Sequence, residues 1–330
     1  MIANIQILRA LAATAVVFYH TGYRVPGFLH TDFLGVGVFF VISGFIMSHI
    51  ARESAGAFMM HRIGRIVPLY WLATFFYATV IWKGMSSKTA TAISLAEDML
   101  FVPRFSEGGT PVEPALGVGW TLNLEMFFYL MFALALAANR RFAPIIVATF
   151  LSTLWLIARA YDLGPLLSFW AHDYTIYFVF GIAVFYLWDK ALPRFSALGW
   201  LLLSCGAILI IAFSFLGSAI AAKAGPPLLV LGAVVLETPG YQCRARFLLL
   251  LGAASYALYL FHPFAIGLAK AVADPSSRIG IALSVTAASV LLGLAIHLLI
   301  EQRITKAIRR YGSSRTSQPA ASAVRDIKSA

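Results

Sequence analysis

Two ionisable residues lie in the first apolar stretch of the chain, LRALAATAVVFYH, which runs from Leu8 to His20. Arg9 and His20 are 11 residues apart, close to three helical turns, so they would share one helix face with about 16 Å between them along the axis. An imidazole exchanges protons near neutral pH, and a guanidinium binds anions. The ordinary alternatives are that Arg9 snorkels to lipid headgroups and that His20 caps a helix end.

A second candidate is the arginine pair in MMHRIGRIVPLYW. Arg62 and Arg65 are three residues apart and therefore share a helix face. Guanidinium groups match the geometry of phosphate oxygens, so the pair could clamp a phosphate. The alternative is a basic and aromatic anchor at the cytoplasmic start of a membrane span.

The third and fourth candidates lie in GWTLNLEMFFYL and ASYALYLFHPF. Glu125 is an acidic residue well inside a strongly apolar range, where a carboxylate needs a partner or a proton. It has either a catalytic role or a purely structural pairing. Ser255, Tyr259 and His262 follow at i, i+4 and i+7, so they form one polar stripe on a helix. His262 could equally be a hydrogen-bonded histidine at the membrane interface.

Motifs for several other chemistries are missing from the sequence. We find no Cys and His cluster with metal-ligand spacing, no phosphate-binding loop of the Walker type and no nucleophile elbow, so we expect no metal. Gly35 and Gly37 do not fit a dinucleotide fingerprint. Together with Ser43 and Gly44 they belong to a small-residue stretch that either packs helices closely or lines a narrow passage. Cys205 and Cys243 are expected to be free thiols.

The composition predicts an integral membrane protein. Of the 330 residues, 60% are hydrophobic and 12% are charged, and the mean hydropathy is +0.83. Soluble domains contain about 25% charged residues. The net charge of +11 does not indicate nucleic-acid binding, because the basic residues lie in short connections between apolar runs, as orientation in a membrane requires.

We predict an all-α polytopic membrane protein with about ten transmembrane helices. About 20 apolar residues are needed to cross a bilayer. The expected ranges are 5–22, 32–50, 66–83, 120–139, 143–160, 172–188, 197–216, 219–236, 247–268 and 279–301. The range 219–236 is the weakest, because it contains Lys223 and a Pro-Pro pair, and residues 89–102 are expected to form a short interfacial helix.

Basic residues set the predicted orientation. If both termini are cytoplasmic, 17 of the 25 Lys and Arg residues face the cytoplasm, among them Arg52, Arg140, Arg141, Lys190, Arg244 and Arg246. The other 8, among them Arg159 and Lys223, face the outside. The first range has no basic leader or clear cleavage site, so we expect a retained helix and not a signal peptide. Residues 1–302 would form a single transmembrane domain, followed by a basic, disordered cytoplasmic tail at 303–330.

These motifs together resemble acyltransferase family 3, the membrane proteins that O-acylate bacterial surface and secreted polysaccharides. The resemblance covers roughly residues 4–302, and the N-terminal half is most similar to exopolysaccharide-modifying members. The family's first-helix pattern is a basic residue, ten other residues and then His, and it matches Arg9 and His20. The family's R-x-x-R pattern matches Arg62 and Arg65. Its Trp-Ser/Thr-Leu-x-x-Glu pattern falls on Trp120, Thr121, Leu122 and Glu125.

The resemblance implies a cytoplasmic acyl-CoA donor, most often acetyl-CoA, and an extracytoplasmic or lipid-linked saccharide acceptor. We expect His20 to act as general base, or as a transient acyl carrier, with Glu125 orienting it. Arg9, Arg62 and Arg65 would bind the donor. Residues expected to contact the saccharide are Trp120, Tyr259 and His262. The bacterial cytoplasmic (inner) membrane and the polysaccharide biosynthesis machinery are the implied setting.

Two other functions share some of these features. A transporter or flippase for lipid-linked sugars would also carry charges within the membrane, but it would move its substrate without consuming acyl-CoA. Inverted repeats would favour it, and we find none in the sequence. A structural partner in a polysaccharide export complex would tolerate changes at both His20 and Glu125.

Overall fold

The fold is all-helical, as the sequence predicts. The computed structural model describes residues 2–27, 34–82, 91–191, 195–237, 240–272 and 274–308, and 79% of the structure is helix. The strands within these residues are β1 (Arg104–Phe105) and β2 (Pro111–Val112), which pair antiparallel.

Every predicted span coincides with helix. The α-helices of the described residues are α1 (Ala3–His20), α2 (Leu34–His49), α3 (Ala55–Phe76), α5 (Ala92–Met99), α6 (Gly119–Ala138), α7 (Ala143–Ala160), α8 (Gly164–Trp170), α9 (Ile176–Tyr186), α10 (Ser196–Leu216), α11 (Ala219–Glu237), α12 (Arg246–Ala253), α13 (Ser255–Lys270) and α14 (Ile279–Ile296). Shorter π- or 3₁₀-helical pieces are η1 (Tyr77–Trp82), η2 (Asp173–Thr175), η3 (Leu187–Ala191) and η4 (His297–Glu301).

Fewer than ten of these helices are individually long and apolar enough to cross a membrane. Within the described residues there are five, or six if α12 and α13 form one span bent by 74°. The five are α6, α7, α10, α11 and the helix that continues from α14 through η4 to Ile308. The multi-pass architecture is therefore present, and the number ten stays a prediction.

The largest differences from the predicted ranges are at three places. The third helix begins at Ala55 and not at 66, because the side chain of Ser54 caps it by accepting a hydrogen bond from Ala57 N. The range 247–268 is broken at Ala254 into α12 and α13. The last helix reaches Ile308, so residues 303–308 do not belong to a disordered tail, and 309–330 lie outside the described residues.

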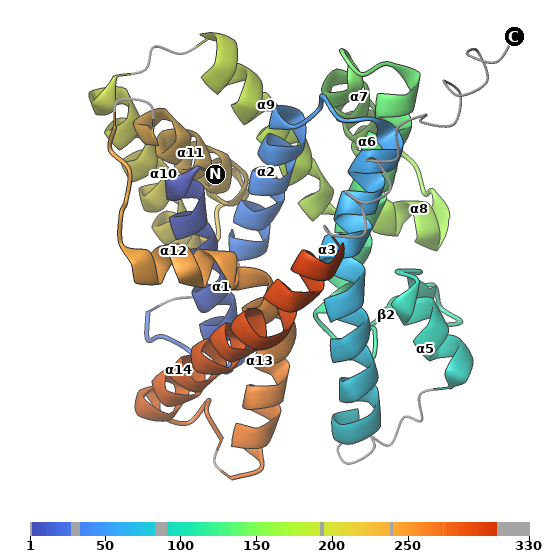
Figure 1. The fold of residues 1–330 in the computed structure, drawn as a ribbon, viewed down its shortest axis with the longest axis vertical. Coiled ribbons are helices and arrows are strands. Elements are labelled where there is room, and N and C mark those ends of the chain that lie inside the picture. The colour runs from blue at the N-terminus through green and yellow to red at the C-terminus, as the bar shows by residue number, and fades with distance from the viewer. Residues whose placement is uncertain are drawn as a thin grey trace, which may run out of the picture.

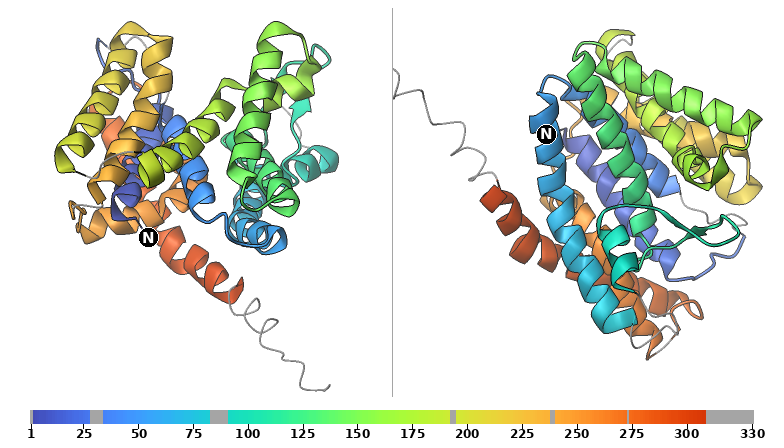
Figure 2. Two further views of the ribbon diagram at one scale, coloured as in Figure 1. Left: turned by 90° about the horizontal axis from the view of Figure 1, so that it is seen from above. Right: turned by 90° about the vertical axis from the view of Figure 1, so that its right-hand side faces the viewer.

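Helix α9 links three other helices of the fold. Helix α9 packs on α2 and also contacts α7 on one side and α11 on the other (Figures 1 and 2). A Cβ atom at Gly44 on α2 would overlap the carbonyl oxygen of Phe178 on α9. The small residue therefore permits this close approach, as the sequence indicates.

An aromatic stack extends this contact to α6. The ring centroids of Phe40 and Phe178 lie 4.3 Å apart, and those of Phe178 and Phe128 lie 4.2 Å apart. Such offset stacks add to the stability of a buried core. The stack fixes the wall that carries Ser43 and Glu125, two residues of the candidate site.

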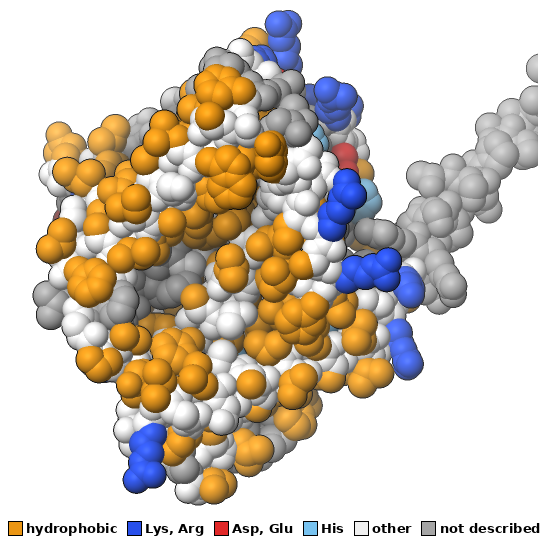
Figure 3. Space-filling view, turned by 90° about the vertical axis from the view of Figure 1, so that its left-hand side faces the viewer, with side chains coloured by type: hydrophobic (Ala, Val, Ile, Leu, Met, Phe, Trp, Pro, Cys, Tyr) orange, Lys and Arg blue, Asp and Glu red, His pale blue; other side chains and the backbone are white. Residues whose placement is uncertain are grey.

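Large apolar side chains remain on the outside of the molecule. Leu201, Ile208 and Leu291 are each at least 60% exposed. Figure 3 shows one such face, where orange apolar side chains dominate and Lys and Arg side chains lie at the edges. Exposed apolar faces of this extent are unusual in soluble monomers and suit contact with lipid.

Candidate active site

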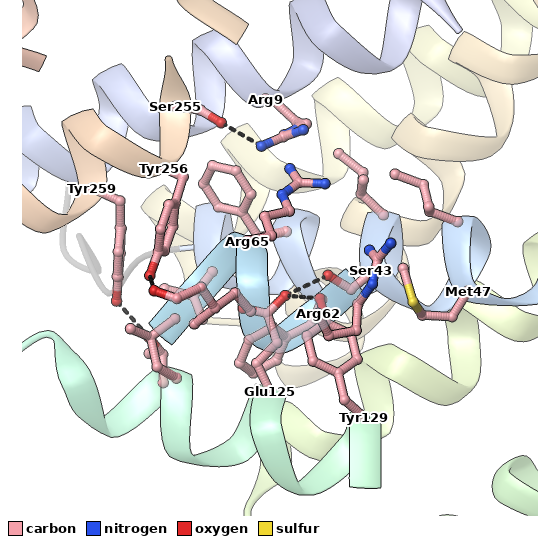
Figure 4. A pocket seen from close by; sticks show the side chains of 18 residues that line it. Arg9, Ser43, Met47, Arg62, Arg65, Glu125, Tyr129, Ser255, Tyr256 and Tyr259 are labelled. Carbon is pink, nitrogen blue, oxygen red and sulfur yellow. Dashed lines mark hydrogen bonds between the residues drawn. The ribbon is translucent and has the colours of Figure 1, made fainter. Parts of the chain in front are cut away.

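A cavity of about 90 Å³ between α1, α2, α3, α6 and α13 brings most of the candidate residues together. Figure 4 shows its lining. The charged members are Arg9, Arg62, Arg65 and Glu125. The polar members are Ser43, Thr121, Tyr129, Ser255, Tyr256 and Tyr259.

The three predicted donor-binding arginines all line this cavity. Arg9 is 8% exposed, and its Nη2 donates to Ser255 Oγ at 2.8 Å. Arg65 is exposed, and its guanidinium points toward that of Arg9 (Figure 4). The guanidinium of Arg62 lies 5.7 Å from the ring centroid of Phe58 and 6.0 Å from that of Tyr129. The Nε atom of Arg62 is buried and has no hydrogen-bond partner among the described residues.

The early start of α3 explains how these arginines reach the cavity. Arg62 and Arg65 follow Ala55 by 7 and 10 residues, which places them about 10 and 15 Å along the helix. They therefore lie two to three turns into the helix and not at its cytoplasmic start, where we expected them.

Charge in the cavity is unbalanced. Neither Arg9, Arg62 nor Arg65 forms an ion pair with an acidic group in the part of the chain that the structure describes. Three guanidinium groups against the single carboxylate of Glu125 leave an excess of two positive charges. Guanidinium groups that have no carboxylate partner suit an anionic ligand.

Two hydroxyl groups hold the carboxylate of Glu125. Ser43 Oγ donates to its Oε1 at 2.9 Å and Tyr129 OH donates to the same atom at 2.5 Å. Glu125 follows Gly119 by six residues, about 9 Å along α6, and Tyr129 is one turn further on the same face.

The expectation that Glu125 orients His20 is not met. The structure gives Glu125 hydroxyl partners and places it among the arginines, in a cavity that His20 does not line. The predicted depths placed both residues in the outer half of the membrane. The prediction did not place Arg62 and Arg65 far enough along α3 to share the cavity with Glu125.

His20 pairs instead with His262. The centroids of the two imidazole rings lie 4.9 Å apart, with 52° between the ring planes. His20 is exposed at the end of α1, and His262 is fully buried on α13. An accessible imidazole backed by a buried one is a geometry that can accept a proton from a ligand hydroxyl.

Backbone hydrogen bonds fix the tautomer of both rings. His20 Nδ1 lies 2.8 Å from the carbonyl oxygen of Val16, and His262 Nδ1 lies 2.8 Å from that of Tyr259. A carbonyl oxygen only accepts, so each Nδ1 carries the proton and each neutral ring keeps its lone pair on Nε2. His262 Nε2 is buried and has no hydrogen-bond partner among the described residues.

Tyr259 connects the cavity to the histidine pair. It lines the cavity, and its ring centroid lies 6.0 Å from that of His262. Its hydroxyl is 2.6 Å from Thr121 Oγ1 and donates to the carbonyl of Val118 at 3.1 Å. The predicted stripe on α13 is thus real: Ser255 binds Arg9 at one end, and His262 meets His20 at the other.

Trp120 lies apart from this arrangement. Its ring contacts His172 and Tyr174, each at 5.6 Å between centroids, and it does not line the cavity. Its expected contact with a saccharide stays a prediction.

Three residues of the site were not among the predicted ones. Ser43 was named only as a member of a small-residue stretch, and Tyr129 and Tyr256 were not singled out. Helical spacing would have found Tyr129, because it follows Glu125 by four residues. Tyr256 donates to the carbonyl of Ile66 at 2.7 Å, a contact between distant segments that no local pattern reveals.

Comparison with known proteins identifies the family. The profile of a family described as an acyltransferase domain matches residues 2–298. An exopolysaccharide production protein, ExoZ of Rhizobium meliloti (strain 1021), is 33% identical over 305 residues, which are 88% of this chain and 95% of that protein. A putative membrane-bound transacylase, BcsY of Komagataeibacter xylinus, is 28% identical over 282 residues, which are 78% and 71% of the two chains.

A shorter match extends to an acyltransferase, MdmB of Streptomyces mycarofaciens, which is 33% identical over 144 residues. This match covers 38% of this chain and 37% of that protein. No solved structure matches the chain.

Proposed function

Because the chain belongs to the acyltransferase family whose domain spans residues 2–298, we propose that it transfers an acyl group from cytoplasmic acyl-CoA to a saccharide hydroxyl. The donor is acetyl-CoA in this proposal. The acceptor is an extracytoplasmic or lipid-linked saccharide, in keeping with the name of the exopolysaccharide production protein that it resembles.

One observation carries the proposal: Tyr259, which lines a positively charged cavity, has its ring 6.0 Å from that of His262, one of two paired histidines whose Nε2 atoms keep their lone pairs. Acyl-CoA carries phosphates at one end and a reactive thioester at the other. The arginines suit the phosphates. His20 suits the activation of a saccharide hydroxyl that attacks the thioester.

The length of the donor fits this separation. Arg9 and His20 lie about 16 Å apart along α1. The pantetheine arm contains about as many covalent bonds in series as the backbone of four amino-acid residues. When it is extended, it therefore spans about 14 Å. Phosphates held at the arginines would therefore place the thioester near the histidine pair.

In the proposed reaction, His20 Nε2 accepts the proton of the saccharide hydroxyl. The oxygen of that hydroxyl attacks the carbonyl carbon of the thioester. The carbon–sulfur bond then breaks, and the leaving thiolate of CoA takes the proton from the imidazolium. His262 donates no proton from Nε2 in its fixed tautomer, so it acts as a hydrogen-bond acceptor for the sugar or for protonated His20. Glu125 is a positioning residue that holds the hydroxyl groups of Ser43 and Tyr129 in the wall of the arginine cavity.

We also propose ten spans with both termini in the cytoplasm. Three connections assigned to the cytoplasm supply Arg52, Arg140 and Lys190, which meet around one cavity. Arg159 and Lys223, both assigned to the outside, also meet, since Arg159 pairs with Asp173 and Lys223 Nζ lies 4.0 Å from the same carboxylate. Both clusters support the assignment of these connections to shared sides of the membrane, and the greater number of basic residues on one side supports its being cytoplasmic. We place the protein in the bacterial inner membrane, beside the machinery that makes the polysaccharide.

The test is mass analysis of surface polysaccharide from cells with and without the protein. Acyl groups on the saccharide should depend on the protein, and purified protein should release CoA from acetyl-CoA only when the saccharide is present. Transport of a lipid-linked sugar without consumption of acetyl-CoA would contradict the proposal.

A further inference from the structure

A second, more polar cavity of about 630 Å³ opens where α2, α6 and α9 end and α7 begins. The basic residues that line it are Arg52, Arg140, Arg141 and Lys190. Aromatic side chains, among them Tyr186 and Trp188, form part of its wall. In the sequence these cations are explained only by the orientation of the chain in the membrane.

The four cations are available to a ligand. All four are exposed, and none forms an ion pair within the described ranges of the chain. Arg141 lies over the ring of Phe142 at 5.6 Å, and Lys190 lies over that of Tyr186 at 5.4 Å. Asp189 is the acidic residue in the lining, so positive charge remains in excess.

Helix α2 connects this cavity to the arginine cavity. Ser43 and Met47 line the arginine cavity, whereas Ser48 and His49 line the second one. Ser43 and His49 are about 9 Å apart along the helix axis. Phe45, which lies between them in the sequence, is fully buried, with its ring centroid 6.2 Å from that of His49 and 5.6 Å from that of Trp188.

We propose that the second cavity binds the 3′-phosphorylated nucleotide end of the acyl-CoA donor. The inference rests on the proposed function, in which the diphosphate lies at Arg9, Arg62 and Arg65. In CoA, six covalent bonds separate the 3′-phosphorus from the nearer phosphorus of the diphosphate. Two residues of polypeptide backbone also contain six bonds, so this part of CoA extends to about 7 Å. That length is comparable with the rise of about 9 Å along α2 from Ser43 to His49, the arginines suit the phosphate, and the aromatic wall suits the adenine.

Anionic lipid headgroups offer the same phosphate chemistry at a cytoplasmic surface. The nucleotide is favoured because neighbouring turns of α2 line both cavities, which places them within reach of one CoA molecule. A lipid phosphate would not need this proximity.

The experiment measures binding of CoA and of dephospho-CoA, which lacks only the 3′-phosphate, to the full-length protein in phosphatidylcholine nanodiscs. The test variant is Arg140→Gln with Arg141→Gln. The matched control is Arg244→Gln with Arg246→Gln, which removes two exposed arginines assigned to the same side that line neither cavity. Thermal unfolding verifies that all three proteins are folded.

We expect the unaltered protein and the control to bind CoA at least tenfold more tightly than dephospho-CoA. The test variant should bind CoA at least tenfold more weakly, while its affinity for dephospho-CoA changes by less than about threefold. Unchanged CoA affinity in this variant would overturn the inference alone. Failure of the unaltered protein to bind CoA would overturn the proposed donor and this inference together.

The lipid alternative has its own readout. Phosphatidylglycerol that copurifies with the protein is quantified for the same three proteins. Loss of that lipid from the Arg140→Gln, Arg141→Gln variant, together with undiminished CoA affinity, would make the cavity a lipid-phosphate site and overturn the inference. Equal lipid content in all three proteins, with the expected loss of CoA affinity, supports it.

Discussion

The imidazoles of His20 and His262 face each other with 4.9 Å between their ring centroids, and each donates its Nδ1 proton to a carbonyl of its own helix. Helices α1 and α13 therefore present two Nε2 lone pairs at one place. The same two helices also meet where Arg9 donates to Ser255. They lie side by side in the same direction and connect the charged cavity to the histidines.

Replacement of His262 tests the use of its Nε2 atom. His262→Asn can keep a donor near the position of Nδ1 but has no group at Nε2, whereas His262→Gln places an amide near Nε2. Since we assign His262 a hydrogen-bonding role, the Gln variant should retain at least tenfold more transfer activity than the Asn variant. Activity is measured as acetyl transfer from labelled acetyl-CoA.

Equal, near-normal activity of both His262 variants would show that Nε2 is not used. Comparable amounts of folded protein in the membrane are the necessary control, because the side chain is fully buried. Thermal unfolding in detergent provides that control.

Glu125 should prove more important for stability than for the chemical step. Glu125→Gln keeps an oxygen that accepts from Ser43 and Tyr129, whereas Glu125→Ala leaves both hydroxyls without this acceptor. An unsatisfied buried hydroxyl costs about 1–3 kcal/mol. The Ala variant should therefore unfold at a clearly lower temperature than the Gln variant in the same detergent.

Tyr129→Phe serves as the partner experiment, because it removes one of the two donors to Glu125 and should cost about 1 kcal/mol. If Glu125→Gln instead abolished transfer while the protein remained fully stable, a direct catalytic role of the carboxylate would replace the positioning role.

Arg62 and Arg65 should determine donor affinity. Replacing both with Gln removes two charges from the cavity, and hydrogen bonds to charged groups contribute about 1.5–3 kcal/mol each. We expect the Kd for acetyl-CoA to rise at least tenfold, as measured by calorimetry. Replacing both with Lys should restore only part of the affinity, since Lys lacks the planar fork of Arg.

The control for the arginine pair is Arg303→Gln with Lys306→Gln, two basic residues of the last helix that line neither cavity. Its affinity for acetyl-CoA should stay within about twofold of the unaltered protein. An unchanged Kd in the Arg62 and Arg65 variant would contradict the phosphate site.

The contact between α2 and α9 should not tolerate even a methyl group. Gly44→Ala would force a Cβ atom against the carbonyl of Phe178, so the helices must separate and the aromatic stack beside them must shift. We expect markedly less folded protein and a lower unfolding temperature. Gly56→Ala is the matched control, because a Cβ there meets nothing within 4 Å and Ala favours a helix by about 0.5–1 kcal/mol.

Helical ranges and shared faces were predictable because each depends on local sequence. The apolar runs located the helices, and spacing placed Arg62 with Arg65 and Ser255 with His262. The start of α3 was missed because its first turns are less apolar, although Ser54 supplies an ordinary cap. The break at Ala254 was also missed, since the apolar pattern continues across it.

Partners across helices could not be predicted from the sequence. Periodicity gives the depth of Glu125 and of His20 on their own helices, but not which helix packs beside each or at what offset. Both the hydroxyl pair around Glu125 and the pairing of His20 with His262 depend on those lateral contacts. The three arginines had been assigned to one ligand, and they do line one cavity, but their spacing across α1 and α3 could not be read from either helix alone.

The most direct test of the account is the rate of acetyl transfer by the His20→Ala variant, measured in nanodiscs with labelled acetyl-CoA and the host's surface polysaccharide. The control is His61→Ala, which removes another exposed imidazole that lines neither cavity. Loss of a general base lowers rates by about 10²–10⁴-fold. The account predicts a loss of this size for His20→Ala with normal folding and near-normal activity for His61→Ala, and full activity of folded His20→Ala would contradict it.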